Sequence, residues 1–132
     1  MEQSWRDFER RVEAACSKLN NDLVRVAAQK PVVHGGVNKR YDIHIAERRQ
    51  GGKGIVLDAK HFANPLPTHE IQTTLAYKVG GRASGVAVIV SATTTVSPAA
   101  QAHAAANQVT IIQDNRNLAS NIRKFVSLHM LC

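Results

Sequence analysis

The chain has 132 residues, of which 44% are hydrophobic, which suits one globular domain over residues 1–132 and excludes a disordered polymer. Lys and Arg outnumber Asp and Glu by 17 to 10, and the formal net charge of +7 favours nucleic acid as the partner. The sequence shows no apolar run of membrane-spanning length, no signal-peptide core in "MEQSWRDFERR" and no C-x-x-C pair, so we expect a cytoplasmic protein with no membrane partner, zinc ribbon or disulfide framework.

The first two segments are predicted to be a helix and a strand. Apolar residues recur at three- and four-residue steps from Trp5 to Leu19, which is typical of one buried helix face. Ser4 stands immediately before this pattern and is the candidate N-cap. The following "DLVRVAAQKPVV" is rich in β-formers, and we interpret most of it as a single strand.

Two extended runs then surround a Gly-rich turn. In "YDIHIA" the residues Tyr41, Ile43 and Ile45 share one face, and "GIVLDAKHF" returns after the turn "ERRQGGKG". The pattern predicts an antiparallel hairpin.

The second half alternates helices and strands. Thr68 is predicted to cap a helix through "HEIQTTLAYKV", and the continuous apolar run "GVAVIVSA" predicts a strand covered on both faces. A second helix begins at Ser97, the strand "VTII" follows, and a last helix begins near Asn117. The order α-β-β-β-α-β-α-β-α predicts an α/β fold with a mixed β-sheet flanked by helices.

The hairpin brings charged residues together. Asp58 and Lys60 are two residues apart on the predicted strand and therefore share a face, and folding about Gln50 places Asp42 opposite Asp58. Two adjacent carboxylates repel each other unless a cation lies between them, and Mg²⁺ prefers oxygen ligands. A neighbouring lysine can orient or activate a metal-bound water. The alternative is a salt bridge at the end of a sheet that contributes little to the stability of the fold.

These motifs resemble those of a known nuclease superfamily. "YDIHI" followed by "VLDAK" resembles the paired motif of the PD-(D/E)xK nucleases, with Asp42 and Asp58 as the two acids and Lys60 as the lysine. The helix motif "FERRV" and the Ser/Thr-rich loop before a helix of small residues resemble, more narrowly, the Mrr-type restriction endonuclease domain. The resemblance implies a restriction-endonuclease-like fold and a Mg²⁺-dependent DNA endonuclease, with Mn²⁺ as a substitute ion.

The resemblance also implies auxiliary site residues. Glu9 of the first helix would be a further acid near the metal, although an ordinary solvated helix acid is equally consistent with its position. Gln72 matches a position at which such nucleases carry a polar residue facing the site, and Glu70 is the alternative there.

Basic residues cluster around the predicted hairpin. They are candidates for neutralising DNA phosphates, and the alternative is a solvated hairpin tip; the set is Lys39, Arg40, Arg48, Arg49 and Lys53.

Several functional alternatives stay open on these residues. The pattern is most like the Mrr-type domain, with a Holliday junction resolvase as the second choice, and the residues alone do not separate the two. We expect a homodimer, because symmetrical cutting of two strands calls for two sites. The apolar stripe Ile122, Phe125, Val126 and Met130 is the candidate dimer surface, unless it packs on the sheet. The alternative function is a non-catalytic DNA-binding or assembly module on the same fold.

Overall fold

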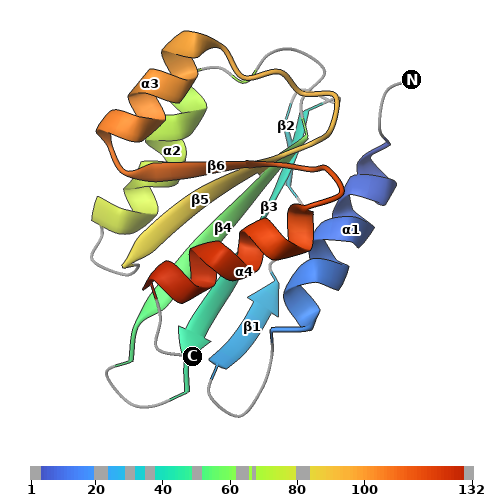
Figure 1. The fold of residues 1–132 in the computed structure, drawn as a ribbon. Coiled ribbons are helices and arrows are strands. Elements are labelled where there is room, and N and C mark those ends of the chain that lie inside the picture. The colour runs from blue at the N-terminus through green and yellow to red at the C-terminus, as the bar shows by residue number, and fades with distance from the viewer. Residues whose placement is uncertain are drawn as a thin grey trace.

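Figure 1 shows the computed structural model, in which helices cover both faces of a β-sheet. The structure describes residues 4–19, 24–28, 32–34, 38–48, 52–61, 66, 68–79 and 84–129. None of the helices in these ranges is long and apolar enough to cross a membrane. The elements are, in chain order, α1 (Trp5–Ser17), β1 (Val24–Ala28), β2 (Val32–His34), β3 (Asn38–Glu47), β4 (Gly54–His61), α2 (Thr68–Val79), β5 (Gly85–Val90), α3 (Pro98–Ala106), β6 (Val109–Gln113) and α4 (Leu118–His129).

The sheet combines an antiparallel half with a parallel half. Its strand order is β1-β3-β4-β5-β6, and β2 pairs with the start of β3. Strand β3 runs antiparallel to β1, β2 and β4, whereas β4, β5 and β6 are parallel. Parallel neighbours need a crossover connection, which α2 supplies between β4 and β5 and α3 supplies between β5 and β6. The mixed α/β fold predicted from the sequence is confirmed.

Two helices begin at the residues that the sequence indicates. The hydroxyl of Ser4 accepts a hydrogen bond from the backbone N–H of Asp7 at 3.1 Å, and that of Ser97 accepts one from Ala100 at 3.1 Å. Both serines therefore satisfy an N–H group that has no partner within the helix. Pro98 occupies the first turn of α3, where its missing N–H removes no helical hydrogen bond.

The β segment before the hairpin differs from the prediction of one strand. It contains two strands, because β1 pairs with residues 43–47 of β3 whereas β2 pairs with residues 38–40. Pro31 stands between them in the sequence and has no N–H to donate to a sheet. The observed order is therefore α-β-β-β-β-α-β-α-β-α, with one more strand before α2 than expected.

The core has one apolar cluster on each face of the sheet. One cluster joins α1 and α4 to Leu57 and Ala59 of β4, and the other joins residues of α2 and α3 to Val56 of β4 and Val88 of β5. Strand β5 is buried along its whole length, which confirms that it is covered on both sides. The two faces of β4 consequently meet different helices.

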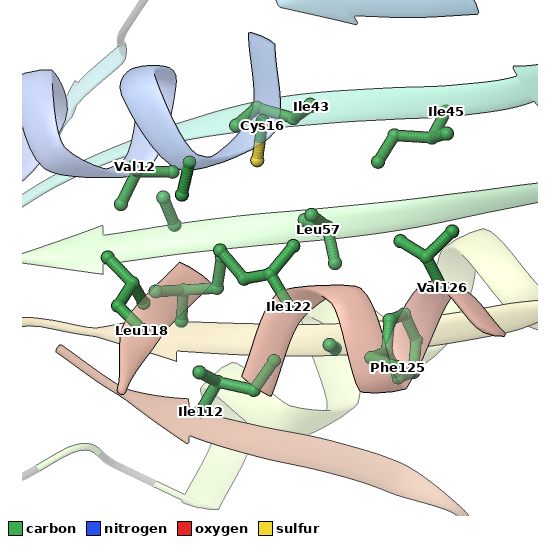
Figure 2. Packing of buried hydrophobic residues seen from close by; sticks show 14 of the residues in the cluster. Val12, Cys16, Ile43, Ile45, Leu57, Ile112, Leu118, Ile122, Phe125 and Val126 are labelled. Carbon is green, nitrogen blue, oxygen red and sulfur yellow. The ribbon is translucent and has the colours of Figure 1, made fainter. Parts of the chain in front are cut away.

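The apolar stripe of α4 packs on the sheet. Ile122, Phe125 and Val126 are buried, and Figure 2 shows them in one cluster with Leu57 of β4. The prediction that these three residues offer a dimer surface is therefore wrong, since the core uses that face of the helix. Met130, the fourth residue of the predicted surface, lies outside the described residues.

Candidate active site

The second half of β4 carries two charged side chains that are fully buried. Asp58 and Lys60 each have 0% relative exposure, although charged residues are rarely buried without a partner. Leu57 and Ala59, which alternate with them, belong to the cluster under α1 and α4. Because successive side chains of a strand point to opposite faces, Asp58 and Lys60 project toward α2.

Two polar residues of α2 complete a buried cluster around this pair. The Nζ atom of Lys60 lies 2.8 Å from Oδ2 of Asp58 and 2.9 Å from Oε2 of Glu70. The hydroxyl of Thr74 donates a hydrogen bond of 2.7 Å to the same Asp58 oxygen. Glu70 and Thr74 are four residues apart and therefore share one face of the helix. We call these four residues the Asp58 cluster.

Glu70 marks the side on which the Asp58 cluster approaches solvent. While its Oε2 contacts the buried Lys60, its Oε1 lies 3.5 Å from Nε2 of His69, whose side chain is 75% exposed. The cluster contains two carboxylates and one ammonium group, so its formal charge is negative. Buried charge of this kind is costly unless it is paired, and it is concentrated at functional sites.

The hairpin register brings a third acid next to the cluster. Asp42 of β3 stands directly opposite Asp58 of β4, and Arg40 stands opposite Lys60. Directly opposite residues of an antiparallel pair have Cα atoms about 4.5–5.5 Å apart. The pairing predicted from folding the hairpin about Gln50 is thus confirmed for the backbone; the side chain of Asp42 lies outside the description.

A comparison with protein families decides the affiliation of the chain. A family model described as a restriction endonuclease, the Mrr catalytic domain, matches residues 1–121. The chain belongs to this restriction endonuclease family. The predicted family resemblance is therefore confirmed.

Among solved structures, the restriction endonuclease domain is similar to EndoMS in its apo form. The sequence identity is 8% and the TM-score is 0.49, with 87% of this chain and 48% of the EndoMS chain covered. The domain thus spans about half the length of that protein. No curated protein matches the chain.

The auxiliary residues predicted for the endonuclease lie apart from the Asp58 cluster in this structure. Glu9 is half-exposed on α1, which packs on the sheet face opposite to the one from which Asp58 projects. Gln72 is exposed, and its Oε1 lies 3.3 Å from Nε2 of His103 on α3. Of the two alternatives on α2, the structure brings Glu70 to the cluster. The roles of Glu9 and Gln72 stay predictions.

The predicted DNA-binding residues divide between the two ends of β4. Lys39 and Arg40 belong to the part of β3 that pairs with His61 and Lys60. Arg48 and Lys53 are exposed at the other end, next to Gly54. At about 3.3 Å per residue, the distance from Gly54 to Lys60 is roughly 20 Å. Arg49 lies outside the described residues.

The donor types at the site fit a hard divalent cation. Carboxylate oxygens are the ligands that Mg²⁺ prefers, and Asp58, Glu70 and Asp42 would be the residues to hold it. Among the side chains that the structure describes, no three His, Cys, Asp or Glu residues lie close enough together to bind a metal ion. In this arrangement the ammonium of Lys60 supplies the positive charge between Asp58 and Glu70.

The sequence did not point to Thr74. A threonine within a helix has no distinctive pattern, and only its spacing of four residues from Glu70 indicates a shared face. Its buried hydroxyl nevertheless donates to a carboxylate oxygen of Asp58.

Proposed function

We propose that this domain is a metal-dependent DNA endonuclease that hydrolyses phosphodiester bonds. The observation that carries the proposal is the buried ammonium of Lys60, which lies 2.8 Å from Asp58 and 2.9 Å from Glu70. Lys60 and Asp58 belong to β4, and Asp42 stands opposite Asp58 on the neighbouring strand β3. Ionisable groups kept in such surroundings are typical of active sites. Membership in the restriction endonuclease family supports the same reaction class.

Each residue of the site has a distinct role in this proposal. Asp42 and Asp58 would hold Mg²⁺, or Mn²⁺ in its place, with Glu70 as the auxiliary acid. The bound ion would activate a water molecule and offset charge on the phosphate. Lys60 would orient the attacking water or stabilise negative charge on the phosphoryl oxygens. Thr74 positions the carboxylate of Asp58 through its hydrogen bond.

Nicking of supercoiled plasmid DNA in Mg²⁺ and in EDTA tests the proposal. Asp58→Asn retains the shape of the side chain but removes its charge, and we expect its nicking rate to fall roughly a hundredfold or more. Glu13→Gln is the matched control, because it removes one exposed carboxylate from α1. Thermal melting of each variant verifies that it is folded.

The outcome also separates the two function classes. A folded protein that binds DNA but shows no Mg²⁺-dependent nicking would contradict the endonuclease proposal. It would favour a non-catalytic DNA-binding or assembly module on the same fold.

We also propose that the working unit is a homodimer, because two-fold symmetry presents two sites to two strands. Ile122, Phe125 and Val126 are used by the core, so the interface must lie elsewhere. Light scattering with and without DNA measures the mass, and a strict monomer in both samples would exclude the dimer. Comparing cleavage of a four-way junction with that of a linear duplex distinguishes a junction resolvase from a general Mrr-like endonuclease.

A further inference from the structure

Helix α4 and the turn before it carry basic residues without any acidic residue. Residues 115–129 are all described, and they contain Arg116, Arg123 and Lys124 but no Asp or Glu. These three side chains are exposed, and none of them forms an ion pair with a described residue. Helix α3, on the other face of the sheet, has no Lys or Arg. Arg116, Arg123 and Lys124 are therefore available to bind a negatively charged partner.

The basic residues of α4 share one side of the helix with two serines. Ser120, Arg123, Lys124 and Ser127 recur at three- and four-residue steps, which places them along one face of α4, and Arg116 stands in the turn just before the helix. The opposite face holds the buried residues that pack on the sheet. Figure 1 shows α4 crossing the front of the sheet with no described element over it. We call these five residues the α4 stripe.

The chemistry of the α4 stripe matches a phosphate backbone. Arg, Lys and Ser side chains are common donors to phosphate oxygens, and all five residues of the stripe can donate. Within α4 the stripe runs from Ser120 to Ser127 and extends about 10.5 Å at 1.5 Å per residue. Along the axis of B-DNA that length corresponds to about three nucleotide steps of one strand at 3.4 Å per step.

Helix α1 on the same face of the sheet offers a contrast. It bears the cations Arg6, Arg10 and Arg11, but Arg11 forms an ion pair with Asp114, and Asp7, Glu9 and Glu13 stand among the three. These acids would repel a polyanion, so the charge pattern favours α4 over α1 as a surface for DNA.

The start of the α4 stripe lies at the same edge of the sheet as the Asp58 cluster. Val90 of β5 is paired with both Lys60 of β4 and Gln113 of β6. Arg116 follows Gln113 by three residues, so it lies close to the end of the strands that carries Lys60. A duplex that contacts Arg116 can therefore reach the edge at which the cluster lies.

We propose that the α4 stripe binds the phosphate backbone of duplex DNA outside the phosphate that is cleaved. The inference rests on the proposed endonuclease function for the identity of the polyanion. Helix α4 packs on the face opposite to the one from which Asp58 and Lys60 project. The stripe consequently holds the substrate and takes no part in the chemical step.

The test measures binding separately from cleavage. Fluorescence anisotropy of a labelled duplex is recorded in EDTA over a range of salt concentrations. For Arg123→Gln/Lys124→Gln we expect the slope of log affinity against log salt to become shallower by about 1.8, since each phosphate contact contributes about 0.9. The affinity at low salt should fall roughly tenfold or more.

The matched control is Lys18→Gln/Arg25→Gln, which removes the same charge from exposed positions on the C-cap of α1 and on β1. Its slope should change by less than about 0.5, well under one phosphate contact. An unchanged slope for the α4 variant, or an equal change in both double variants, would overturn the proposal. Absence of Mg²⁺-dependent cleavage by the wild type would instead contradict the endonuclease function and leave the binding result standing.

Discussion

Replacement of Lys60 by methionine isolates the electrostatic role of the ammonium group in the Asp58 cluster. Methionine has a similar length and volume, so Lys60→Met removes the charge with little change in packing. It leaves Asp58 and Glu70 as two buried carboxylates with no cation between them. Removing one partner of a buried ion pair typically costs about 3–5 kcal/mol, and we expect a loss of that size in the free energy of unfolding.

Glu70→Gln provides the comparison within the same cluster. It leaves the contact of 2.8 Å between Lys60 and Asp58 in place and removes the excess negative charge. We therefore expect a cost of at most about 1 kcal/mol, the usual net value of a hydrogen bond. A domain of this size has a total stability of about 5–15 kcal/mol, so both variants should remain folded at low temperature.

Urea unfolding in EDTA, followed by circular dichroism, measures both free energies. The deficit of Lys60→Met should shrink as the pH is lowered, because protonation of one carboxyl group removes the repulsion between the two. Millimolar Mg²⁺ or Mn²⁺ should also restore part of the loss, because an ion that binds only the folded state stabilises it. Equal costs for Lys60→Met and Glu70→Gln would refute the assignment of Lys60 as the charge that holds the two carboxylates.

Three further predictions concern single contacts. Thr74→Val should cost about 1–3 kcal/mol in urea unfolding because Asp58 loses a buried hydrogen bond, whereas Thr74→Ser should retain most of the stability; identical values for the two would contradict this. Gly85→Ala should lower the free energy of unfolding by about 1–3 kcal/mol, because the added Cβ would lie 2.6 Å from the ring of His129. A second change, His129→Ala, should restore much of the lost stability, as measured by thermal melting. Burial raises the pKa of Cys16 to about 12 from 9.0, so the thiol should resist alkylation at pH 8 in the native protein. The thiol ionises above pH 9 only in the unfolded chain, because its pKa is higher in the folded protein. The difference in unfolding free energy between wild type and Cys16→Ala should therefore be constant below pH 9 and shrink by up to about 1.4 kcal/mol per pH unit between 9 and 12. A difference that does not change with pH would contradict this.

Much of the arrangement around the site was predictable because antiparallel pairing has a simple arithmetic. In a hairpin, the residue numbers of opposite partners have a constant sum, so the turn around Gln50 predicted that Asp42 stands opposite Asp58. The structure has that register. The period of two along β4 likewise predicted that Asp58 and Lys60 share a face, which their common contacts with α2 confirm.

The choice between Glu70 and Gln72 could not be made from the sequence. Residues two positions apart on a helix, such as Glu70 and Gln72, differ by about 200° around its axis, so they point in nearly opposite directions. Which of them meets the sheet depends on how α2 docks, and among the described side chains of α2 the packing buries Glu70, Ile71 and Thr74. The division of the first β segment into β1 and β2 was missed for a related reason: Pro31 marks a break in the sequence, but the sequence does not reveal which part of β3 each half will pair with.

The separation between the two ends of β4 has a practical consequence for engineering. The β3–β4 connection, next to Gly54, is roughly 20 Å from Lys60 at the strand's rise per residue. Extra residues placed in that connection leave the strand register intact, whereas one residue inserted within β4 would exchange the faces of Leu57 and Asp58. A fluorophore or a peptide tag introduced at this connection would therefore report on the domain from a position remote from the Asp58 cluster. Length variation among natural homologues should be tolerated at the same place.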